Sequence, residues 1–524
     1  MKTFDFCLLA PALLLGTALT ASAQSPYVGE ALNYSRLQFG GPARTQGIAG
    51  ANVALGADFG NLNSNPAGLG LYRKSEVTFT PGVGIGSADA TSTGAALNSQ
   101  KNSFHLGSFG AVIANPLASD DNSSDWRAGN FAIGLTRLAD FNTTYQYAGQ
   151  VANNRSFFQY LREPGRAEFG TAAYQSGVRK IDDQVGPAGS TPVYSNVDGL
   201  AYGAYLTDFV PNSNPGRLVT LRAANRGGVA QGETVTTSGS VSQFDLGYGG
   251  SYKDRLFVGG AIGIVGSNRK QVRAFGGASA NDTVAFALRD ETSTSGSGFN
   301  ARIGVIYRFN DVLRVGGSVQ TPTFMQLDET YSTRLTSTFT PALRLKNGTS
   351  LGTVSTSTPE GKYSYSLTTP FRANGGVALT VGKLGFVTAD AEYVGYGQAR
   401  LSGNPGNANG DDNSFSAENQ SIKNAYRSVV NLRFGAEARL DVFRLRAGYA
   451  RYADPYLNQP TDRSQQFYTA GLGLRQNNFF LDVAEVYTTF NQLYTPYSLV
   501  SGLQPVTRIA NNRYTTTVTA GFTF

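Results

Sequence analysis

The chain contains one histidine, His105, in the segment Ser103-Phe-His-Leu-Gly107. In a strand this segment would place His105 on the polar face, opposite Phe104 and Leu106, so we expect it to point into a water-filled interior. Hydrolysis by an activated serine would need a Gly-x-Ser-x-Gly elbow or a partnered histidine, and the sequence offers neither that elbow nor a carboxylate pair at a telling spacing. We therefore interpret His105 as an ordinary lining residue and expect no catalytic residues and no enzyme activity; loss of an activity on His105→Ala would reverse this.

Several arginines share the inward phase of strand-like segments. An arginine of this kind could bind a ligand carboxylate, because a bidentate guanidinium contact is strong away from water. The alternative is a polar interior in which arginines pair with Glu437 or Asp441 near a turn, and the sequence singles out no ligand arginine. No cofactor and no metal site are expected. The arginines are Arg302, Arg308, Arg433, Arg439, Arg444 and Arg446.

The first 23 residues have the pattern of a secretory signal peptide. A lysine near the N-terminus is followed by an apolar run from Leu8 to Leu19 and by Ala21-Ser-Ala23, so we expect residues 1–23 to be removed and Gln24 to become the N-terminus. The apolar run is shorter than the roughly 20 residues that span a bilayer. Cys7 is the only cysteine, so the expected mature chain has neither a disulfide nor a Cys-ligated metal.

The rest of the chain has few charged residues but no long apolar stretch, and the fold must account for both. Only 15% of the residues are charged, yet no stretch after residue 23 reaches 18 apolar residues, as a transmembrane helix would require. Strands of alternating polarity resolve this, because half of each strand can face lipid and half water. The net charge of +7 is diffuse, and no basic run predicts a nucleic-acid partner.

The C-terminal residues 514–524 alternate strictly. Tyr514, Val518 and Phe522 share one face with the terminal Phe524, and threonines occupy the other. An outer-membrane barrel closes on such a strand, whereas a soluble protein rarely leaves one exposed. We expect this strand to pair with the first strand near residue 74, and Phe524 to be recognised by the outer-membrane assembly machinery.

Short and long connections take turns along the chain. Six short turns (116–125, 253–254, 309–311, 382–383, 441–442 and 476–478) alternate with seven Ser/Thr/Asn/Gly-rich segments (89–100, 140–238, 267–297, 323–364, 397–426, 453–464 and 491–511). Short periplasmic turns and long extracellular loops are typical of bacterial outer-membrane barrels. The pattern predicts an all-β, 14-stranded antiparallel transmembrane β-barrel over residues 74–524, with strands beginning near residues 74, 101, 127, 239, 255, 298, 312, 365, 384, 427, 443, 465, 479 and 512. A soluble β-sandwich is the alternative, but its loops would not sort into two alternating sets.

Residues 24–73 precede the first expected strand and are rich in glycine. A lumen enclosed by fourteen strands is too wide for strand side chains to fill, so we expect this segment to form a hatch inside it. The run from Gly47 to Asp58, followed by Asn65-Pro66-Ala67-Gly68-Leu69, resembles the N-terminal signature of the FadL/TodX family of outer-membrane transporters for hydrophobic compounds. The segments 313–322 and 369–377 add support, and only the Asn-Pro-Ala-Gly segment is reasonably specific.

The resemblance implies a fold and a function. It implies a 14-stranded barrel with an N-terminal hatch, in which Asn65, Pro66, Ala67 and Gly68 take part in gating. It also implies passive uptake of long-chain fatty acids or other hydrophobic compounds, with capture by extracellular loops and lateral exit through the wall. A FadL-like barrel can instead act as a protein-interaction component of secretion, of the PorV type. In either case we expect a monomer in the bacterial outer membrane, in contact with the bilayer.

The 99-residue segment 140–238 is the longest expected loop. Its apolar content exceeds what a solvated loop leaves exposed, so part of it should fold over the barrel mouth. We expect a short helix over residues 200–210. Any one aromatic or apolar residue of this loop could instead serve only to pack the loop against itself. The candidate residues for ligand access are Phe157, Phe158, Tyr160, Leu206 and Phe209.

Overall fold

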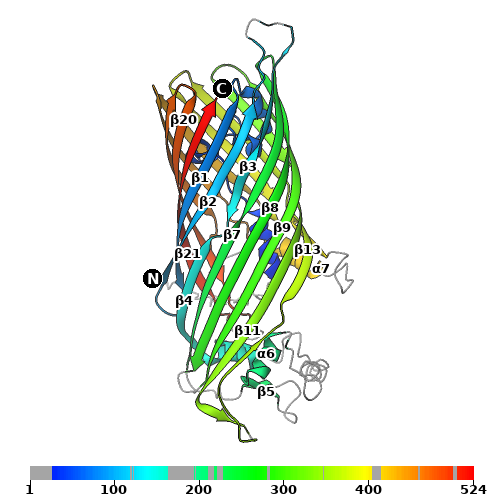
Figure 1. The fold of residues 1–524 in the computed structure, drawn as a ribbon, viewed down its shortest axis with the longest axis vertical. Coiled ribbons are helices and arrows are strands. Elements are labelled where there is room, and N and C mark those ends of the chain that lie inside the picture. The colour runs from blue at the N-terminus through cyan, green and yellow to red at the C-terminus, as the bar shows by residue number, and fades with distance from the viewer. Residues whose placement is uncertain are drawn as a thin grey trace, which may run out of the picture.

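The computed structural model shows a closed antiparallel barrel with fourteen wall positions, drawn in Figure 1. The structure describes residues 26–524 except 119–120, 122, 163–193, 195, 210–217, 221–227, 280–283, 346, 404–414, 458–460 and 500–503. The expected signal peptide therefore lies outside the described residues. Among the described residues, no helix is both long and apolar enough to cross a membrane.

Ten wall positions are single strands and four are strands interrupted once. The single strands are β1 (Glu76–Thr91), β2 (Leu97–Ile113), β7 (Gly228–Tyr252), β8 (Leu256–Ser279), β9 (Val284–Arg308), β17 (Ser428–Leu440), β18 (Phe443–Tyr452), β19 (Gln465–Gln476), β20 (Phe479–Tyr494) and β21 (Thr507–Thr523). The interrupted ones are β3 (Trp126–Asp140) with β4 (Thr143–Ala152), β10 (Leu313–Gln320) with β11 (Phe324–Arg344), β14 (Arg372–Val381) with β13 (Gly361–Thr368), and β15 (Gly385–Gly395) with β16 (Arg400–Gly403).

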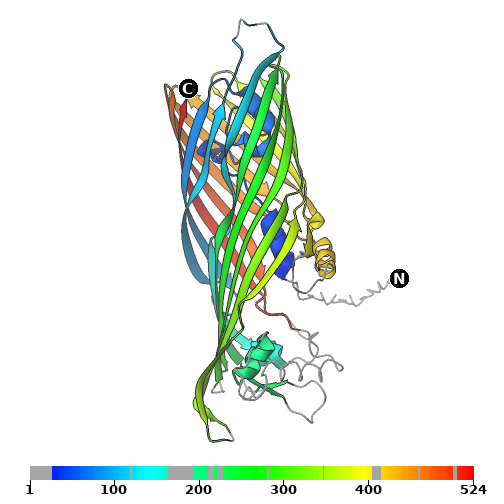
Figure 2. The ribbon, with the colours of Figure 1, turned by 45° about the vertical axis from the view of Figure 1, so that its right-hand side comes forward.

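The remaining described elements lie in the connections and at the N-terminus. They are α1 (Pro26–Ser35), α2 (Ala43–Gly47), α3 (Asn61–Ser64), η1 (Pro66–Leu71), η2 (Asn153–Arg155), α4 (Phe157–Arg162), α6 (Val197–Gly203), β5 (Thr207–Phe209), β6 (Leu218–Thr220), β12 (Ser350–Ser357), η3 (Tyr396–Gln398) and α7 (Ser416–Ala425). In Figure 2 the N-terminal elements, coloured blue, lie inside the barrel.

The first and last strands close the barrel. β21 pairs with β1 from Glu76↔Thr523 to Thr91↔Arg508, and the backbone of Phe524 exchanges two hydrogen bonds with that of Ser75. On β21, Tyr514 is exposed on the outer face, whereas Thr519 is buried on the inner face. The predicted closing strand and its two faces are confirmed.

The predicted short turns at 253–254, 309–311, 382–383, 441–442 and 476–478 are also confirmed, whereas the predicted turn at 116–125 lies partly outside the described residues. Each of four turns uses residues with positive φ: Lys253 and Asp254, Gly382, Asp441, and Asn477. Gly, Asp and Asn tolerate this conformation, and turns of this kind match the twist of paired strands.

An apolar belt surrounds the barrel on its outer face. Ile262 on β8, Ile303 on β9 and Leu472 on β19 are each more than 60% exposed. The belt has aromatic edges: on one side Tyr449, Tyr468, Tyr487 and Tyr514 form a row across β18 to β21, with ring centroids 4.8–6.2 Å apart. Near the turns, Trp126 packs on Tyr252, Tyr307 on Phe309 and Phe522 on Phe524. An apolar band between two aromatic girdles is the surface of an outer-membrane barrel.

The strands extend far beyond this belt, which corrects the predicted loops. β7 and β9 each have 25 residues, whereas a tilted strand needs only about 9–11 to cross a membrane. On β9 the outer face changes from Phe299 to Ser297, Ser295 and Ser293, all still paired with β8. Segments 140–238, 267–297 and 323–364 therefore contain long stretches of strand whose outer face meets water instead of lipid, so the apolar residues of that face are missing and the composition resembles that of a loop.

The far ends of these strands carry an extracellular cap with its own apolar core. Phe157, Phe158 and Leu161 of α4 pack with Leu200 and Leu206 against strand residues such as Phe275 and Phe286. Figure 1 shows α6 and β5 at the end opposite the C-terminus. The expected helix over 200–210 is wrong in position: α6 covers Val197–Gly203, capped by the side chain of Asn196, and a strand begins at Thr207.

The edge of the belt can be tested with two matched substitutions on the outer face of β8. Ile262→Arg should destabilise the barrel by about 2–4 kcal/mol, because a charge near the membrane midplane is costly there. Asn268→Arg, on the same face above the belt, should change stability by about 0–1 kcal/mol. Urea unfolding in lipid vesicles measures both; equal costs would place the belt edge elsewhere.

Candidate functional site

The N-terminal segment Pro26–Tyr72 is held to the barrel wall by its own polar groups, and Asn65 is central to this. The Oδ1 atom of Asn65 accepts from the backbone N–H of Ala67 at 3.2 Å and so caps η1. Its Nδ2 donates to the carbonyl of Val53 at 2.7 Å and to that of Val305 on β9 at 3.1 Å. Asn65 thus joins two parts of the segment to the wall.

Wall glycines let the segment lie directly against the strands. A Cβ on Gly259 would lie 2.4 Å from the carbonyl oxygen of Pro66, and one on Gly304 would lie 1.8 Å from Oδ1 of Asn65. Gly68 itself has no space for a side chain, since a Cβ there would lie 2.5 Å from Cγ of Asn61. The Asn-Pro-Ala-Gly segment predicted from sequence is therefore a site of close contact with the wall.

Further bonds hold the segment around the circumference. Arg302 on β9 donates to the carbonyl of Leu62 at 2.6 Å, and Asp390 on β15 accepts from the N–H of Val53 at 3.0 Å. On the opposite side Thr519 of β21 accepts from the N–H of Ala43 at 2.7 Å. Moving the whole segment would break all of these bonds, each worth about 0.5–1.5 kcal/mol or more.

Gly304→Ala tests this close contact. The new methyl group would displace Asn65, and we expect a loss of about 1–3 kcal/mol in the stability of the segment. The control is Gly317→Ala on β10, where the nearest atom is 3.5 Å away. Limited proteolysis from the periplasmic side should cut residues 42–72 in the first variant and spare them in the second.

Helix α1 occupies the lumen above this closely bound part. Val28, Ala31 and Leu32 are buried against wall residues of β11, β13 and β15 and against Ile422 of α7. Glu30 of α1 forms an ion pair with Arg269 of β8 at 2.7 Å. The apolar part of the extracellular lumen is thus filled by the protein's own helix.

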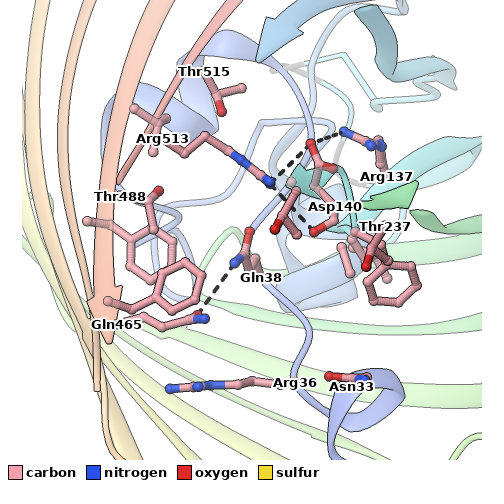
Figure 3. Close-up of a pocket in the computed structure, with 18 of the residues that line it drawn as sticks. Asn33, Arg36, Gln38, Arg137, Asp140, Thr237, Gln465, Thr488, Arg513 and Thr515 are labelled. Carbon is pink, nitrogen blue, oxygen red and sulfur yellow. Dashed lines mark hydrogen bonds and ion pairs between the residues drawn. The ribbon is translucent and has the colours of Figure 1, made fainter. Parts of the chain in front are cut away.

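Beside α1 lies a cavity of about 290 Å³ with mixed walls, shown in Figure 3. Its polar lining includes Arg36, Gln38, His105, Arg137, Asp140, Arg463 and Arg513, and its apolar lining includes Leu32, Phe39, Leu138, Phe141, Phe467 and Phe490. Such a cavity suits a ligand with both an apolar body and a polar group.

The barrel wall is interrupted next to this cavity. β2 pairs with β3 only from Ser108↔Thr136 to Ile113↔Phe131, whereas Leu97–Leu106 of β2 pairs with β1 alone among the described strands. Beyond Thr136, β3 and then β4 follow β7 instead. β4 packs its Tyr145 and Tyr147 with Ala88 and Ala90 of β1, so it turns inward behind β2.

This gap opens within the apolar belt. Phe104 on the free edge of β2 is 80% exposed and pairs with Val83 of β1. Val83 is two residues from Ile85, which pairs with Tyr514, so Phe104 lies close to the level of the tyrosine row. His105 and Gly107 on one side of the gap, and Arg137 and Phe141 on the other, line the cavity. The break in strand pairing thus lies next to both the cavity and the apolar belt.

Asp140 and Arg513 hold the bend between β3 and β4. Oδ1 of Asp140 accepts from the backbone N–H of Asn142 at 2.7 Å, and the carboxylate pairs with Arg137 at 3.0 Å and Arg513 at 3.2 Å. Arg513 on β21 also donates to the backbone carbonyl of Asn142. Figure 3 shows Arg137 and Arg513 converging on Asp140 from opposite sides.

A lysine side chain crosses the gap. Lys101 on the free edge of β2 donates from Nζ to the carbonyl of Thr237 on β7 at 2.8 Å and to the hydroxyl of Ser238. This contact lies on the extracellular side of the tyrosine row. Lys101 is one residue beyond Asn102, and Asn102 pairs with Ile85, which pairs in turn with Tyr514 of that row. Lys101 thus bridges the two sides at the extracellular end of the break.

Most arginines predicted to face inward form ion pairs. Arg302 pairs with Asp245, Arg433 with Glu392, Arg308 with Asp311, and Arg439 and Arg446 with Glu437. The polar-interior interpretation therefore applies to them. Arg137 and Arg513, which adjoin the cavity, were not among the predicted candidates; Arg513 could have been found from its inward phase on the terminal strand.

The candidates for ligand access lie in the extracellular cap. Phe157, Phe158 and Leu206 are buried in its core, and the ring of Tyr160 stacks on Phe157. The side chain of Phe209 lies outside the described residues, although its backbone belongs to β5. Their role in ligand access stays a prediction. His105 lines the cavity, as expected, and the described residues contain no group of three or more His, Cys, Asp or Glu that could hold a metal.

Comparison with known proteins shows likeness in structure. No protein-family model matches the chain, and no curated protein does. A FadL homologue of Pseudomonas aeruginosa matches with a TM-score of 0.53 at 12% identity, over 92% of this chain and 98% of that chain. The toluene transporters TodX of P. putida (TM-score 0.49, 12% identity, 93% and 99% covered) and TbuX of Ralstonia pickettii (0.48, 13%, 93% and 99%) are also similar. The resemblance that the sequence indicated is confirmed at the level of the fold: the chain has the architecture of a FadL-type outer-membrane barrel.

Proposed function

We propose that this barrel takes up hydrophobic compounds across the outer membrane and releases them sideways into the bilayer through the gap between β2 and β3. One observation carries the proposal: the lumen cavity and the break in strand pairing share His105, Gly107, Arg137 and Phe141, and the break lies in the apolar belt. An apolar molecule gains free energy by passing from such a cavity into lipid and gains none from an aqueous pore. The transport named for TodX and TbuX supports the same class of ligand.

The charges of the cavity favour a ligand with an anionic head. Arg137 and Arg513 share the single carboxylate of Asp140. Arg36 and Arg463 form no ion pair among the described residues, and the Nε of each is buried without a hydrogen-bond partner there. A carboxylate would satisfy such donors, because a buried unpaired donor costs about 1–3 kcal/mol. We therefore propose long-chain fatty acids as the ligands, with the chain directed toward Phe141 and the gap.

The N-terminal segment is the proposed hatch. Residues 42–72 close the periplasmic half of the lumen, whereas α1 occupies the space beside the cavity. α1 contacts the bend directly, since the rings of Tyr34 and Phe141 meet edge to face at 5.8 Å. A shift of α1 would admit ligand to the cavity without opening a pore to the periplasm. The protein is then a passive transporter and not an enzyme.

The test compares ligands that differ only in the head group. Cells that depend on this barrel should take up labelled oleate at least about fivefold faster than labelled octadecene, since one charge-assisted contact contributes about 1.5–3 kcal/mol. Arg36→Gln combined with Arg463→Gln should remove the preference and keep uptake of the neutral compound. Equal uptake rates for the two compounds with the unaltered protein would contradict the fatty-acid assignment. If cells without the protein lost secreted proteins from their surface and still took up oleate normally, the secretion role would be favoured.

A further inference from the structure

A second cavity, of about 380 Å³, lies at the opposite end of the lumen, below the N-terminal segment. It is separate from the cavity beside α1, and the two share no lining residue. Its walls come from the last residues of β17 and β19, the first residues of β18 and β20, the ends of β1 and β21, and the N-terminal segment. The lining includes Arg44, Glu76, Glu437, Arg439, Arg444, Arg446, Arg475, Asn477, Asn478, Phe479 and Phe480.

Glu437 is the centre of the charge network in this cavity. Its carboxylate accepts from Arg446 at 2.7 Å and from Arg439 at 3.0 Å, and Arg44 of the N-terminal segment approaches to 3.5 Å. Three guanidinium groups from three elements therefore converge on one carboxylate. Glu437 neutralises only one of these charges.

The other carboxylates are shared as well. Asp482 accepts from Arg446 at 2.7 Å and from Arg475 at 2.8 Å, and Asp58 lies 3.3 Å from Arg44. Arg444 has no ion-pair partner in the described chain and donates only to the carbonyls of Asp441 and Phe443. The cavity thus holds an excess of positive charge even when Glu76 is counted as ionised.

An unsatisfied donor marks the same place. Arg446 is buried, and its Nη2 atom has no hydrogen-bond partner among the described residues, although its Nε and Nη1 atoms do. A buried donor without a partner costs about 1–3 kcal/mol, so an added acceptor would be stabilising. The structure provides a charged, buried group on the wall of the cavity as well as the excess charge.

The cavity lies at the level of the periplasmic aromatic girdle. Phe479, which lines it, is 47% exposed on the outer face of β20 and pairs with Phe522 of β21. Arg475 lies over the ring of Phe480, 4.2 Å from its centroid. The headgroups of the periplasmic leaflet lie at this height, since aromatic girdles mark the membrane interfaces.

We propose that this cavity binds a phosphate group, supplied by an anionic phospholipid of the periplasmic leaflet or by free phosphate. A tetrahedral oxyanion can accept from several guanidinium groups that approach from different sides. Arg439, Arg444 and Arg446 approach from β17 and β18, and Arg44 and Arg475 from the segment above and from β19. The proposal does not depend on the ligand carried through the lumen.

The experiment measures binding to the purified, detergent-solubilised barrel. Equilibrium dialysis with labelled inorganic phosphate tests the free ion, and native mass spectrometry compares dioctanoyl phosphatidylglycerol with dioctanoyl phosphatidylcholine. The test variant is Arg439→Gln with Arg444→Gln, which removes two charges and leaves the buried pairs of Arg446 intact. The control is Arg308→Gln with Arg255→Gln, which removes two charges from the same rim outside the cavity; both arginines lie at turns.

We expect saturable binding that weakens at least tenfold in the test variant and less than twofold in the control. Retention of phosphatidylglycerol over phosphatidylcholine identifies the lipid as the source, and binding of inorganic phosphate without lipid preference identifies the free ion. Absence of saturable binding by either probe, or equal weakening in the control, would overturn the proposal. Circular dichroism and heat-modified migration confirm that both variants fold.

Discussion

Arg513→Ala should reduce uptake of labelled oleate about tenfold or more while the barrel still assembles. Arg513 forms an ion pair with Asp140 and donates to the backbone of Asn142, so it holds β3 and β4 in the inward bend. Charge-assisted hydrogen bonds contribute about 1.5–3 kcal/mol, and every 1.4 kcal/mol corresponds to a factor of about ten in the population of the bent form. Without them β3 can continue along β2 and close the gap.

Two further variants separate this effect from general destabilisation. Arg508→Ala removes an exposed arginine from the outer face of the same strand and should leave uptake unchanged. Arg513→Lys keeps the charge but loses the forked geometry, so it should give an intermediate rate. Normal uptake by Arg513→Ala would show that the bend does not depend on this contact.

Two deletions in the N-terminal segment should have different effects. Removal of residues 24–70 should raise permeability to hydrophilic solutes at least about tenfold, because fourteen strands leave a lumen that their side chains do not fill. Removal of residues 24–35 alone should leave the barrel impermeable, since Asn65 and the bonds of residues 42–72 remain, and should raise the rate at which ligand reaches the cavity. Planar-bilayer conductance measures the first effect and ligand binding kinetics the second.

The shorter deletion carries a cost that must be controlled. It leaves Arg269 without Glu30, and a buried charge without its partner destabilises a protein by about 3–5 kcal/mol. Combining the deletion with Arg269→Gln removes that cost. A long deletion that assembles fully and conducts no current would show that strands and loops alone close the lumen.

The sequence predicted the barrel well because lipid imposes a simple rule on strands. Where one face meets lipid, as at Tyr514, Val518 and Phe522, apolar and polar residues must alternate, and the turns between such strands need residues that accept positive φ. The strand number and the closing pair follow from those two patterns. The glycine-rich composition around Asn65 indicated a closely packed segment inside the barrel. It did not reveal the partners of Asn65 on β9.

The sequence could not show the parts of the wall that lie outside the membrane or bend. On β9 the outward residues Ser293, Ser295 and Ser297 face water, so no apolar residues on that face mark the segment as a strand. The bend at Asp140 depends on Arg513, which is 373 residues away in the chain. The aromatic residues of segment 140–238 indicated a folded cap, but burial of Phe157 and Phe158 against Phe286 is a tertiary contact that composition cannot reveal.

The central claim is that ligand leaves through the gap between β2 and β3, and a reversible crosslink tests it directly. Lys101→Cys with Ser238→Cys places one thiol on each side of the gap in a chain whose described part has no cysteine. A short bis-methanethiosulfonate reagent joins the pair, and dithiothreitol releases it. The control pair, Ser238→Cys with Lys270→Cys, joins β7 and β8 where they are already paired. Oleate uptake should stop when the first pair is joined, return on reduction, and be unaffected in the control; full uptake with the gap crosslinked would contradict lateral release.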